Sequence, residues 1–305
     1  MMKVGAKKEM SDKPTIRVGF VDYFNPVDEF FIDVLSPSFD VVRDDRNPEY
    51  LFFCDENFGQ ANLQYDPRNV VKIFYTGENR RPWNYQCHHA ITFDHMEGPQ
   101  FYRFPLYALE NWVNQKKLGW QDYRTFSRII PSRKELKEKG FCSFVVRNGG
   151  CQERNDVFHK LSEYKRVDSG GPLYNNVGGP IDQDGFGSHI TKTDFLHKRK
   201  FHIAYENSSY PGYVTEKILH GFLASTIPIY WGSPCVEMDF NRKAFVSRHD
   251  FRTTDDMIDY IKYLDNNDDA YIKILEEPIM DPKNRFVELS NLRNWFVDNV
   301  YRGNK

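Results

Sequence analysis

Apolar residues recur along this chain with two different periods. Short runs rich in β-branched and aromatic residues predict strands at residues 15–24, 39–43, 50–54, 70–75, 90–93, 141–146, 201–205 and 227–231. Longer segments with a helical distribution of apolar and polar residues predict helices at residues 28–35, 108–120, 132–139, 152–161, 214–222, 255–264, 269–275 and 287–301. Short strands that alternate with helices predict an α/β fold with parallel sheets.

The pattern changes between residues 120 and 140, where basic and polar residues predominate. A chain of 305 residues is long enough for two domains that each bury a core. We interpret residues 101–120 as the exit from the first domain and place the domain border in the connector that follows. The expected division is a disordered leader at residues 1–14, a first domain at 15–130, a second at 131–286 and a terminal helix at 287–305.

The segment at residues 200–234 is the most informative part of the chain. Its pattern predicts a strand, a polar loop with glycine and proline, a helix and a second strand. Such a unit places a helix N-terminus at the carboxyl end of a parallel strand, where α/β sheets bind ligands. Glu216 and Lys217 lie in the first turn of this helix. In an arbitrary helix they would be a carboxylate favoured by the helix dipole and a solvated lysine.

A second candidate anion site precedes the helix at residues 152–161. Gly149 and Gly150 allow backbone N–H groups to approach a phosphate, and Arg154 in the first turn adds a forked cation. The glycine pair alone is a weak signal, because it matches neither a Walker loop nor a dinucleotide fingerprint.

A carboxylate also follows the strand at residues 70–75, in the sequence Thr76-Gly-Glu78-Asn79. This position, next to a glycine turn at the carboxyl end of a strand, is where α/β enzymes place reacting groups. The alternative is a solvated turn residue, since turns are rich in polar side chains.

Composition narrows the class of protein. The 41 basic and 43 acidic residues leave a formal net charge of −2, which gives no footprint of a nucleic-acid-binding protein. The five cysteines are scattered and never spaced as CxxC, which favours reduced thiols in a cytosol over disulfides or structural zinc. No apolar run reaches the roughly 20 residues that span a bilayer, and the first residues lack the apolar core of a signal peptide. We therefore expect a soluble protein.

Three motifs resemble the α1,3-fucosyltransferase family. The sequence YVTEK at residues 213–217, preceded by Tyr205-Glu-Asn207 and followed by IPIYWGSP at 227–234, resembles the donor-binding signature of that family. TGEN at residues 76–79, with Pro82 and Asn84 after it, resembles the loop that carries the family's catalytic base, and VDSGG at 167–171 with NNVGG at 175–179 resembles its central motif. The resemblance covers residues 15–300.

The resemblance implies the GT-B glycosyltransferase fold, with two Rossmann-like domains facing a cleft. Residues 15–130 would bind the acceptor, residues 131–286 would bind GDP-fucose, and the helix at 287–305 would return to the first domain. By position, Glu216 would hold the ribose diol, Lys217 would lie on the pyrophosphate, and Asn207 and Tyr213 would shape the nucleotide-sugar pocket. Arg154 matches the arginine that contacts the diphosphate, with Arg147 and Lys192 as lesser candidates.

The same resemblance implies that Glu78 is the general base. It also implies that a clamp of cationic side chains replaces a metal ion, so that no cofactor is required. Whether a non-essential divalent cation also binds stays open. Aromatic stacking and position assign Trp83, Tyr85 and Glu97 to the acceptor. The implied reaction is inverting transfer of L-fucose from GDP-fucose to the 3-hydroxyl of GlcNAc in N-acetyllactosamine-type glycans. Its Lewis x type product would belong to protein or lipopolysaccharide glycosylation.

The resemblance further implies a bacterial, cytoplasmic protein, and attachment to the inner face of the membrane stays open. Two alternatives from other classes remain at this point. Asp182 and Asp184 form a DxD pair that could hold a divalent metal in a glycosyltransferase of the A fold. The chain could also be a glycan-binding relative without activity, although a base and a leaving-group clamp in one chain favour catalysis.

Overall fold

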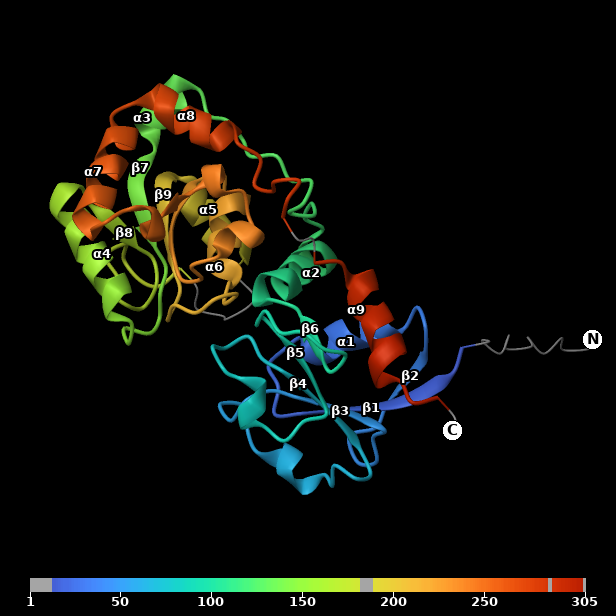
Figure 1. Cartoon of the computed structure of the whole chain (residues 1–305). Coiled ribbons are helices and arrows are strands. Elements are labelled where there is room, and N and C mark those ends of the chain that lie inside the picture. Colours follow the sequence, from blue (N-terminus) through green and yellow to red (C-terminus); the bar gives the residue numbers. More distant parts are fainter. Residues whose placement is uncertain (1–12, 182–188, 285–286, 304–305) are drawn as a thin grey trace, which may run out of the picture. The chain divides into compact units, whose positions relative to one another are not determined.

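The computed structural model describes residues 13–181, 189–284 and 287–303 (Figure 1). Most of the predicted leader at residues 1–14 and the pair Asp182 and Asp184 lie outside these residues. The chain folds into two compact units. Unit 1 contains the described residues up to Thr92, Met96–Phe104 and the described residues from Val287 onward, and unit 2 contains Phe93–His95 and the described residues from Pro105 to Asn284.

Unit 1 is built on a parallel sheet with the strand order β2-β1-β3-β4-β5-β6. Its strands are β1 (Thr15–Val21), β2 (Asp40–Arg43), β3 (Tyr50–Phe53), β4 (Val71–Tyr75), β5 (His89–Thr92) and β6 (Phe101–Arg103). Its helices are α1 (Val27–Leu35), α9 (Leu289–Trp295), the short η1 (Ala61–Gln64) and η2 (Pro82–Asn84), and the π-helical η7 (Phe296–Val300). Every residue of β3 and β4 is buried, as expected for central strands of a parallel sheet.

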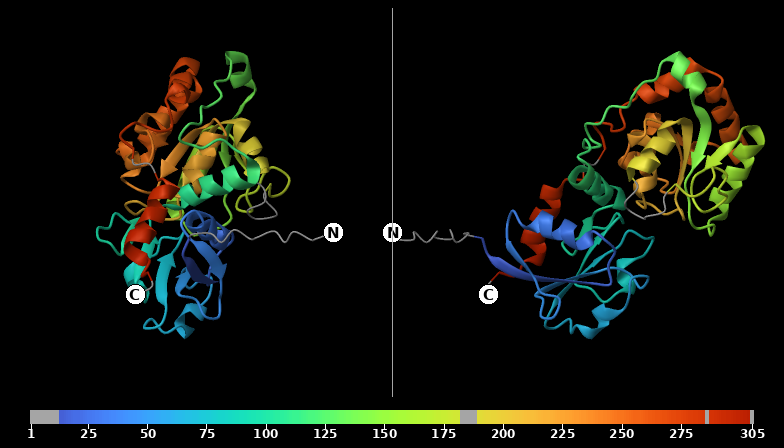
Figure 2. Two further views of the ribbon diagram at one scale, coloured as in Figure 1. Left: turned by 90° about the vertical axis from the view of Figure 1, so that its right-hand side faces the viewer. Right: turned by 180° about the vertical axis from the view of Figure 1, so that it is seen from behind.

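The last helix of the chain completes the core of unit 1. The ring of Phe296 lies 5.7 Å from that of Phe39, 5.3 Å from that of Tyr50 and 6.3 Å from that of Phe52. Trp295 donates a hydrogen bond of 3.0 Å to the carbonyl oxygen of Pro99. Helix α9 contacts α1, and the two lie side by side in both further views (Figure 2).

Unit 2 has a second parallel sheet, with the strand order β11-β10-β9-β7-β8. Its strands are β7 (Gly140–Phe144), β8 (Val167–Ser169), β9 (Arg199–Tyr205), β10 (Ile227–Trp231) and β11 (Val246–Ser247). Its α-helices are α2 (Leu106–Leu118), α3 (Arg133–Glu138), α4 (Gln152–Tyr164), α5 (His189–His197), α6 (Glu216–Leu223), α7 (Thr254–Asp265) and α8 (Asp268–Glu276). The short helices η4 (Val236–Met238), η5 (Arg242–Ala244) and η6 (Arg248–Asp250) complete it.

The border between the units differs from the one expected near residue 130. Helix α2 belongs to unit 2, where it packs against α6. Tyr107 donates a hydrogen bond of 2.8 Å to Asp239, and the carboxylate of Glu110 lies 2.9 Å from the ring nitrogen of His220. These polar groups are buried, and both contacts lie inside unit 2. An apolar pattern says that a helix has a buried face, but it does not say which core that face meets.

Candidate functional site

The strand order of unit 2 identifies a binding edge. Strand β7 lies between β8 and β9 in the sheet. The chain therefore runs from β7 to its neighbour on one side, β8, and then crosses to the neighbour on the other side, β9. Ligands of open α/β sheets bind at such a switch point, beyond the carboxyl ends of the strands. The loop after β7 leads into α4 and Arg154, and the loop after β9 leads into α6 with Glu216 and Lys217. Both anion sites predicted from sequence therefore belong to the switch point.

Lys217 lies within a cluster of oxygen atoms. Its ammonium nitrogen is 3.2 Å from a carboxylate oxygen of Glu206 and 3.5 Å from one of Glu216, and it donates a 3.0 Å hydrogen bond to Thr215. Burial alone would lower the pKa of Lys217, but the two carboxylates raise it above its ordinary value. The side chain is therefore a permanent cation at neutral pH.

Glu216 is the second member of this cluster. Burial alone would raise its pKa, but the positive charges of Lys217 and Lys192 hold it well below the ordinary value. About a quarter of its side chain is exposed. Glu216 thus presents an ionised carboxylate that can accept hydrogen bonds from a ligand, as its predicted contact with a ribose diol requires.

Glu206 is a site residue that sequence reasoning missed. It follows β9 directly and is fully buried. Its carboxylate accepts hydrogen bonds from the backbone N–H of Thr215 at 2.8 Å and from the Thr215 hydroxyl at 2.6 Å, besides pairing with Lys217. The only signal in the sequence was its position inside the motif Tyr205-Glu-Asn207.

Arg154 is almost fully buried, with 3% of its surface exposed. One terminal nitrogen donates a 2.5 Å hydrogen bond to the carbonyl of Asn148, whereas its Nε atom has no hydrogen-bond partner among the described residues. Burial lowers the pKa of Arg154, and the carboxylates of Glu206 and Glu216 oppose that effect. A buried guanidinium with an unused donor is suited to an anionic ligand. Arg147, by contrast, is exposed.

The loop after β9 brings Tyr213 to the same cluster. Tyr213 is 2% exposed, and its ring packs edge-on against Phe93 at 5.0 Å. The tyrosine interacts electrostatically with Arg154 and Lys217. The loop depends on Gly212, which has a φ of 84° and where a Cβ atom would overlap the carbonyl oxygen of Phe93. Asn207 lies at the start of this loop and is exposed.

The predicted base and acceptor residues belong to unit 1. Glu78 is half-buried and lies in the loop after β4. Its backbone N–H donates a 3.0 Å hydrogen bond to the Thr76 hydroxyl, which in turn donates at 2.5 Å to the fully buried carboxylate of Asp55. This chain of bonds links the carboxyl ends of β3 and β4 and fixes the turn that carries Glu78.

The three predicted acceptor residues differ in exposure. Trp83 lies in η2 and is 63% exposed. Tyr85 stacks on Phe74 at 4.2 Å and donates from its hydroxyl to Glu56, so one face of its ring is covered. Glu97 is exposed in the turn between β5 and β6. Trp83 is therefore the residue of this set with an aromatic surface available to a sugar.

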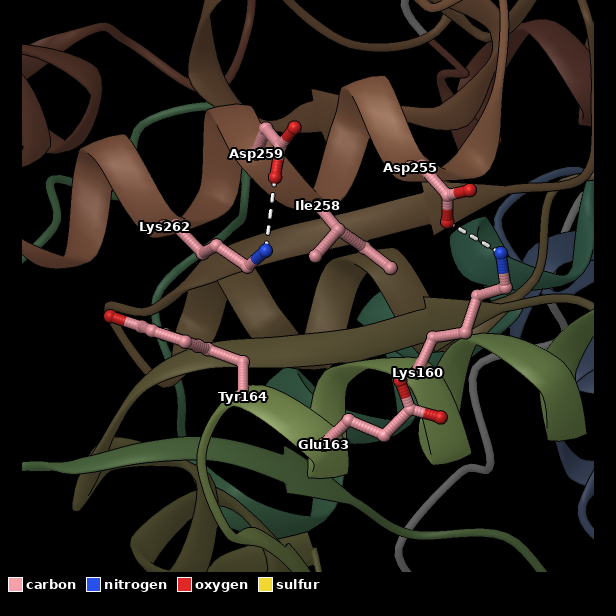
Figure 3. Close-up of a pocket in the computed structure, with 7 residues that line it drawn as sticks. All are labelled: Lys160, Glu163, Tyr164, Asp255, Ile258, Asp259 and Lys262. Carbon is pink, nitrogen blue, oxygen red and sulfur yellow. Dashed lines mark hydrogen bonds and ion pairs between the residues drawn. The ribbon is translucent and has the colours of Figure 1, made fainter.

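A cavity of about 640 Å³ lies in unit 2 between α4 and α7 (Figure 3). Its lining residues are Lys160, Glu163, Tyr164, Asp255, Ile258, Asp259 and Lys262. Both lysines of the lining are paired, Lys160 with Asp255 at 2.5 Å and Lys262 with Asp259 at 3.0 Å. The first pair joins α4 to α7, and the second lies along α7. None of the predicted site residues lines this cavity.

Among the residues that the structure describes, no group of three or more His, Cys, Asp or Glu side chains is arranged to hold a metal ion. The pair Asp182 and Asp184, which suggested a metal site, lies outside these residues. In the same part of the chain, no helix combines the length and the apolar character needed to cross a membrane.

Two family models match this chain. The model of the α-(1,3)-fucosyltransferase FucT N-terminal domain matches residues 17–110, and the model of the C-terminal part of glycosyltransferase family 10 (fucosyltransferase) matches residues 134–276. The α-(1,3)-fucosyltransferase FucT of Helicobacter pylori is 32% identical over 243 residues, which are 72% of this chain and 49% of FucT. GDP-fucose protein O-fucosyltransferase 3 of Xenopus laevis is 31% identical over 250 residues, which are 78% of this chain and 49% of that protein.

The chain thus spans about half the length of these two relatives. The crystal structure of an α1,3-fucosyltransferase with GDP-fucose matches it with a TM-score of 0.75 and 27% identity, over 100% of this chain and 95% of the other. Together with the two parallel sheets, this match confirms the predicted α/β class and the GT-B fold.

Proposed function

Since this chain belongs to the fucosyltransferases of glycosyltransferase family 10, we propose that it transfers L-fucose from GDP-fucose, with inversion, to the 3-hydroxyl of GlcNAc in N-acetyllactosamine-type glycans. The product would be of the Lewis x type. The observation that carries the proposal is the cluster at the switch point of unit 2, where Lys217 lies in the first turn of α6 and the buried Arg154 interacts electrostatically with Glu206 and Glu216.

Unit 2 is the proposed donor domain. Lys217, Arg154 and the first N–H groups of α6 stabilise the negative charge that grows on GDP as the bond to fucose breaks. Glu216 accepts hydrogen bonds from the ribose diol, while Tyr213 and Asn207 shape the nucleotide-sugar pocket. The permanent positive charge of Lys217 supports this assignment, because a leaving diphosphate needs a cation that does not titrate near neutral pH.

Unit 1 is the proposed acceptor domain. Glu78 takes the proton from the acceptor hydroxyl as that oxygen attacks C1 of fucose, which is general-base catalysis. The bonded turn that holds Glu78 at the end of β4 supports this role. Trp83 offers a face for stacking against the acceptor sugar, and Tyr85 and Glu97 complete the proposed acceptor set.

The likeness to GDP-fucose protein O-fucosyltransferase 3 supports a second acceptor class, a protein hydroxyl. The donor chemistry would be unchanged. We propose no cofactor for either reaction, because the cations of the cluster can perform the task of a metal at the diphosphate. The five cysteines are all free, which supports the cytoplasm as the proposed compartment.

The test is a transfer assay with the purified chain and GDP-fucose. N-acetyllactosamine is offered in one arm and an unmodified Ser/Thr-containing folded protein domain in the other, each with and without EDTA. We expect a mass increase of one fucose on the disaccharide that survives EDTA, with an α-linked product by NMR. Labelling of the protein alone would identify the second acceptor class. Loss of all transfer in EDTA would favour the metal-dependent alternative through Asp182 and Asp184.

The base is tested by Glu78→Gln. The variant should bind GDP like the unmodified chain, because Glu78 belongs to the acceptor domain, and its turnover should fall by a factor on the order of 10²–10⁴. Glu49→Gln, which changes an exposed glutamate of the same unit, is the matched control. Normal turnover of Glu78→Gln would transfer the role of base to Glu97 or Asp94.

A further inference from the structure

The carboxylate of Glu206 is fully buried and still makes three contacts at the start of α6, two with the N-cap residue Thr215 and one with Lys217. Residue Glu206 follows β9 directly, and its backbone N–H donates a 2.8 Å hydrogen bond to the carbonyl oxygen of Trp231 in the neighbouring strand β10. Gly232 leaves room for it, since a Cβ atom at that position would overlap the Glu206 side chain and lie 2.7 Å from the Tyr230 hydroxyl. A fully buried charge needs partners, and within the described part of the chain the carboxylate of Glu206 contacts Thr215 and Lys217.

The first effect of Glu206 concerns the start of α6. Thr215 is the N-cap residue, and a threonine there usually accepts a hydrogen bond from an N–H group of the first turn. Here the Thr215 side chain makes no such bond: its hydroxyl donates to Glu206, and its oxygen accepts from the ammonium group of Lys217. Thr215 therefore does not cap the N–H groups at the start of α6, and the N–H of Glu216 bonds to the carboxylate of its own residue. The proposal places the anion at the N–H groups that follow in this first turn.

The second effect concerns Lys217. The oxygen of Glu206 that accepts from the Thr215 hydroxyl also pairs with the ammonium group at 3.2 Å. Lys217 is thereby held between two carboxylates, one from β9 and one from its own helix. Other titratable groups that act on this cluster are Arg154 of α4, Lys192 of α5, His202 of β9, Tyr213 of the loop, His220 of α6 and Tyr230 of β10.

From these contacts we propose that Glu206 is a positioning residue for the transfer reaction. It fixes the ammonium group of Lys217 at the diphosphate position and keeps the N-terminus of α6 open for the donor. This role rests on the proposed function, but Glu206 itself does not touch the substrate. It acts through Lys217 and Thr215.

Glu206→Gln tests the proposal selectively. The glutamine carbonyl can keep the bond from the Thr215 backbone N–H, which only an acceptor can satisfy, and this fixes its amide group toward Lys217. The variant then places N–H donors against an ammonium group where the unmodified chain has a carboxylate. A lysine in a partly dry site that loses its counter-charge titrates at lower pH.

The measurement is an NMR titration of the chain labelled with ¹³C at the lysine ε-carbon. The Lys217 signal is identified by its loss in Lys217→Arg. We expect Lys217 of the unmodified chain to keep its proton up to the alkaline limit of the folded chain, and Lys217 of Glu206→Gln to lose it at least about one pH unit below that limit. A fall of kcat/KM at alkaline pH that follows this lysine should appear in the variant. Glu206→Asp, which keeps the charge, should recover part of both properties.

Glu110→Gln is the matched control. Glu110 is another buried carboxylate of unit 2, and it contacts α6 through His220 at 2.9 Å without reaching Lys217. This variant should lose stability and leave the Lys217 titration in place. An unchanged Lys217 titration in Glu206→Gln would overturn the proposal and leave Glu206 a purely structural residue.

If Glu206→Gln does not fold, the titration is made on Glu206→Asp, where a smaller shift in the same direction is expected and no shift contradicts the proposal. The titration needs no substrate. A chain that transfers no fucose would therefore refute the proposed function, while the titration still decides whether Glu206 controls Lys217.

Discussion

At the scale of single residues, the charge balance of the switch point determines which side chains matter. The cations Lys217 and Arg154 face the carboxylates of Glu206 and Glu216, so the four charges cancel before any ligand binds. A diphosphate that enters must then be stabilised by geometry as well as by net charge. Fixed cations and N–H groups that point at the phosphates supply such stabilisation, because they need no reorganisation during the reaction.

This balance leads to a prediction for Lys217→Ala. Removal of the ammonium group leaves two buried or half-buried carboxylates beside the diphosphate, so kcat should fall by a factor on the order of 10²–10³. Lys160→Ala serves as the control. Lys160 lies in α4, its side chain is 41% exposed, and it pairs with Asp255 on the surface. Steady-state kinetics with GDP-fucose make the comparison. Equal kcat values for the two variants would remove Lys217 from the mechanism.

The sequence indicated three members of the cluster at the switch point but not their pairing. The local pattern places Glu216, Lys217 and Arg154 in the first turn of a helix that follows a strand, whereas their donor role was implied by the family resemblance and stays a prediction. Glu206 was missed because its partner Lys217 is separated from it by a loop. The path of that loop depends on Gly212, and the place of the Glu206 side chain depends on the space at Gly232; a periodicity shows neither.

At the scale of elements, long and buried strands were predicted and very short ones were not. Strands β7, β9 and β10 contain apolar runs that are visible without knowledge of the fold. Strands β6, β8 and β11 have three, three and two residues, and they exist because a neighbouring strand offers them hydrogen bonds. Such edge strands depend on tertiary context, so the sequence alone gave no signal for them.

The terminal helix shows the same limit and allows a stability prediction. The pattern predicted one helix at residues 287–301, but the structure has α9 followed by the π-helical η7, with Phe296 at the junction. Phe296 is 2% exposed and contacts three aromatic rings of unit 1. Phe296→Ala should therefore lower the free energy of unfolding of unit 1 by about 3–5 kcal/mol.

The next residue of the same segment provides the control. Val297 is 36% exposed, so Val297→Ala should change the free energy of unfolding by no more than about 0.5 kcal/mol. Urea denaturation followed by hydrogen exchange in β1 and β3 distinguishes the two. Similar losses for both variants would mean that Phe296 does not anchor the helix.

At the scale of the whole molecule, the chain builds unit 1 from both of its ends. Residues from β1 to β6 supply the sheet, and the segment from Val287 onward supplies α9 and η7. The domain border was predicted too far along the chain, because the apolar pattern of α2 shows a buried face and does not show which of the two units that face meets. Its packing against α6 and the contacts of Tyr107 and Glu110 within unit 2 assign it to that unit.

A chain ended after residue 286 tests this arrangement. Without α9 and η7, the rings of Phe39, Tyr50 and Phe52 lose the contact with Phe296, and the core of unit 1 is opened to water. The main core cluster of unit 2, which extends from Leu136 to Leu275, contains no residue of the deleted segment. Hydrogen exchange should therefore show protection lost in β1 and β3 and kept in β7, β9 and β10.

Because the proposed donor residues all belong to unit 2, the shortened chain should still bind GDP while it no longer transfers fucose. Loss of protection in both sheets together would instead show that the two units unfold as one cooperative body.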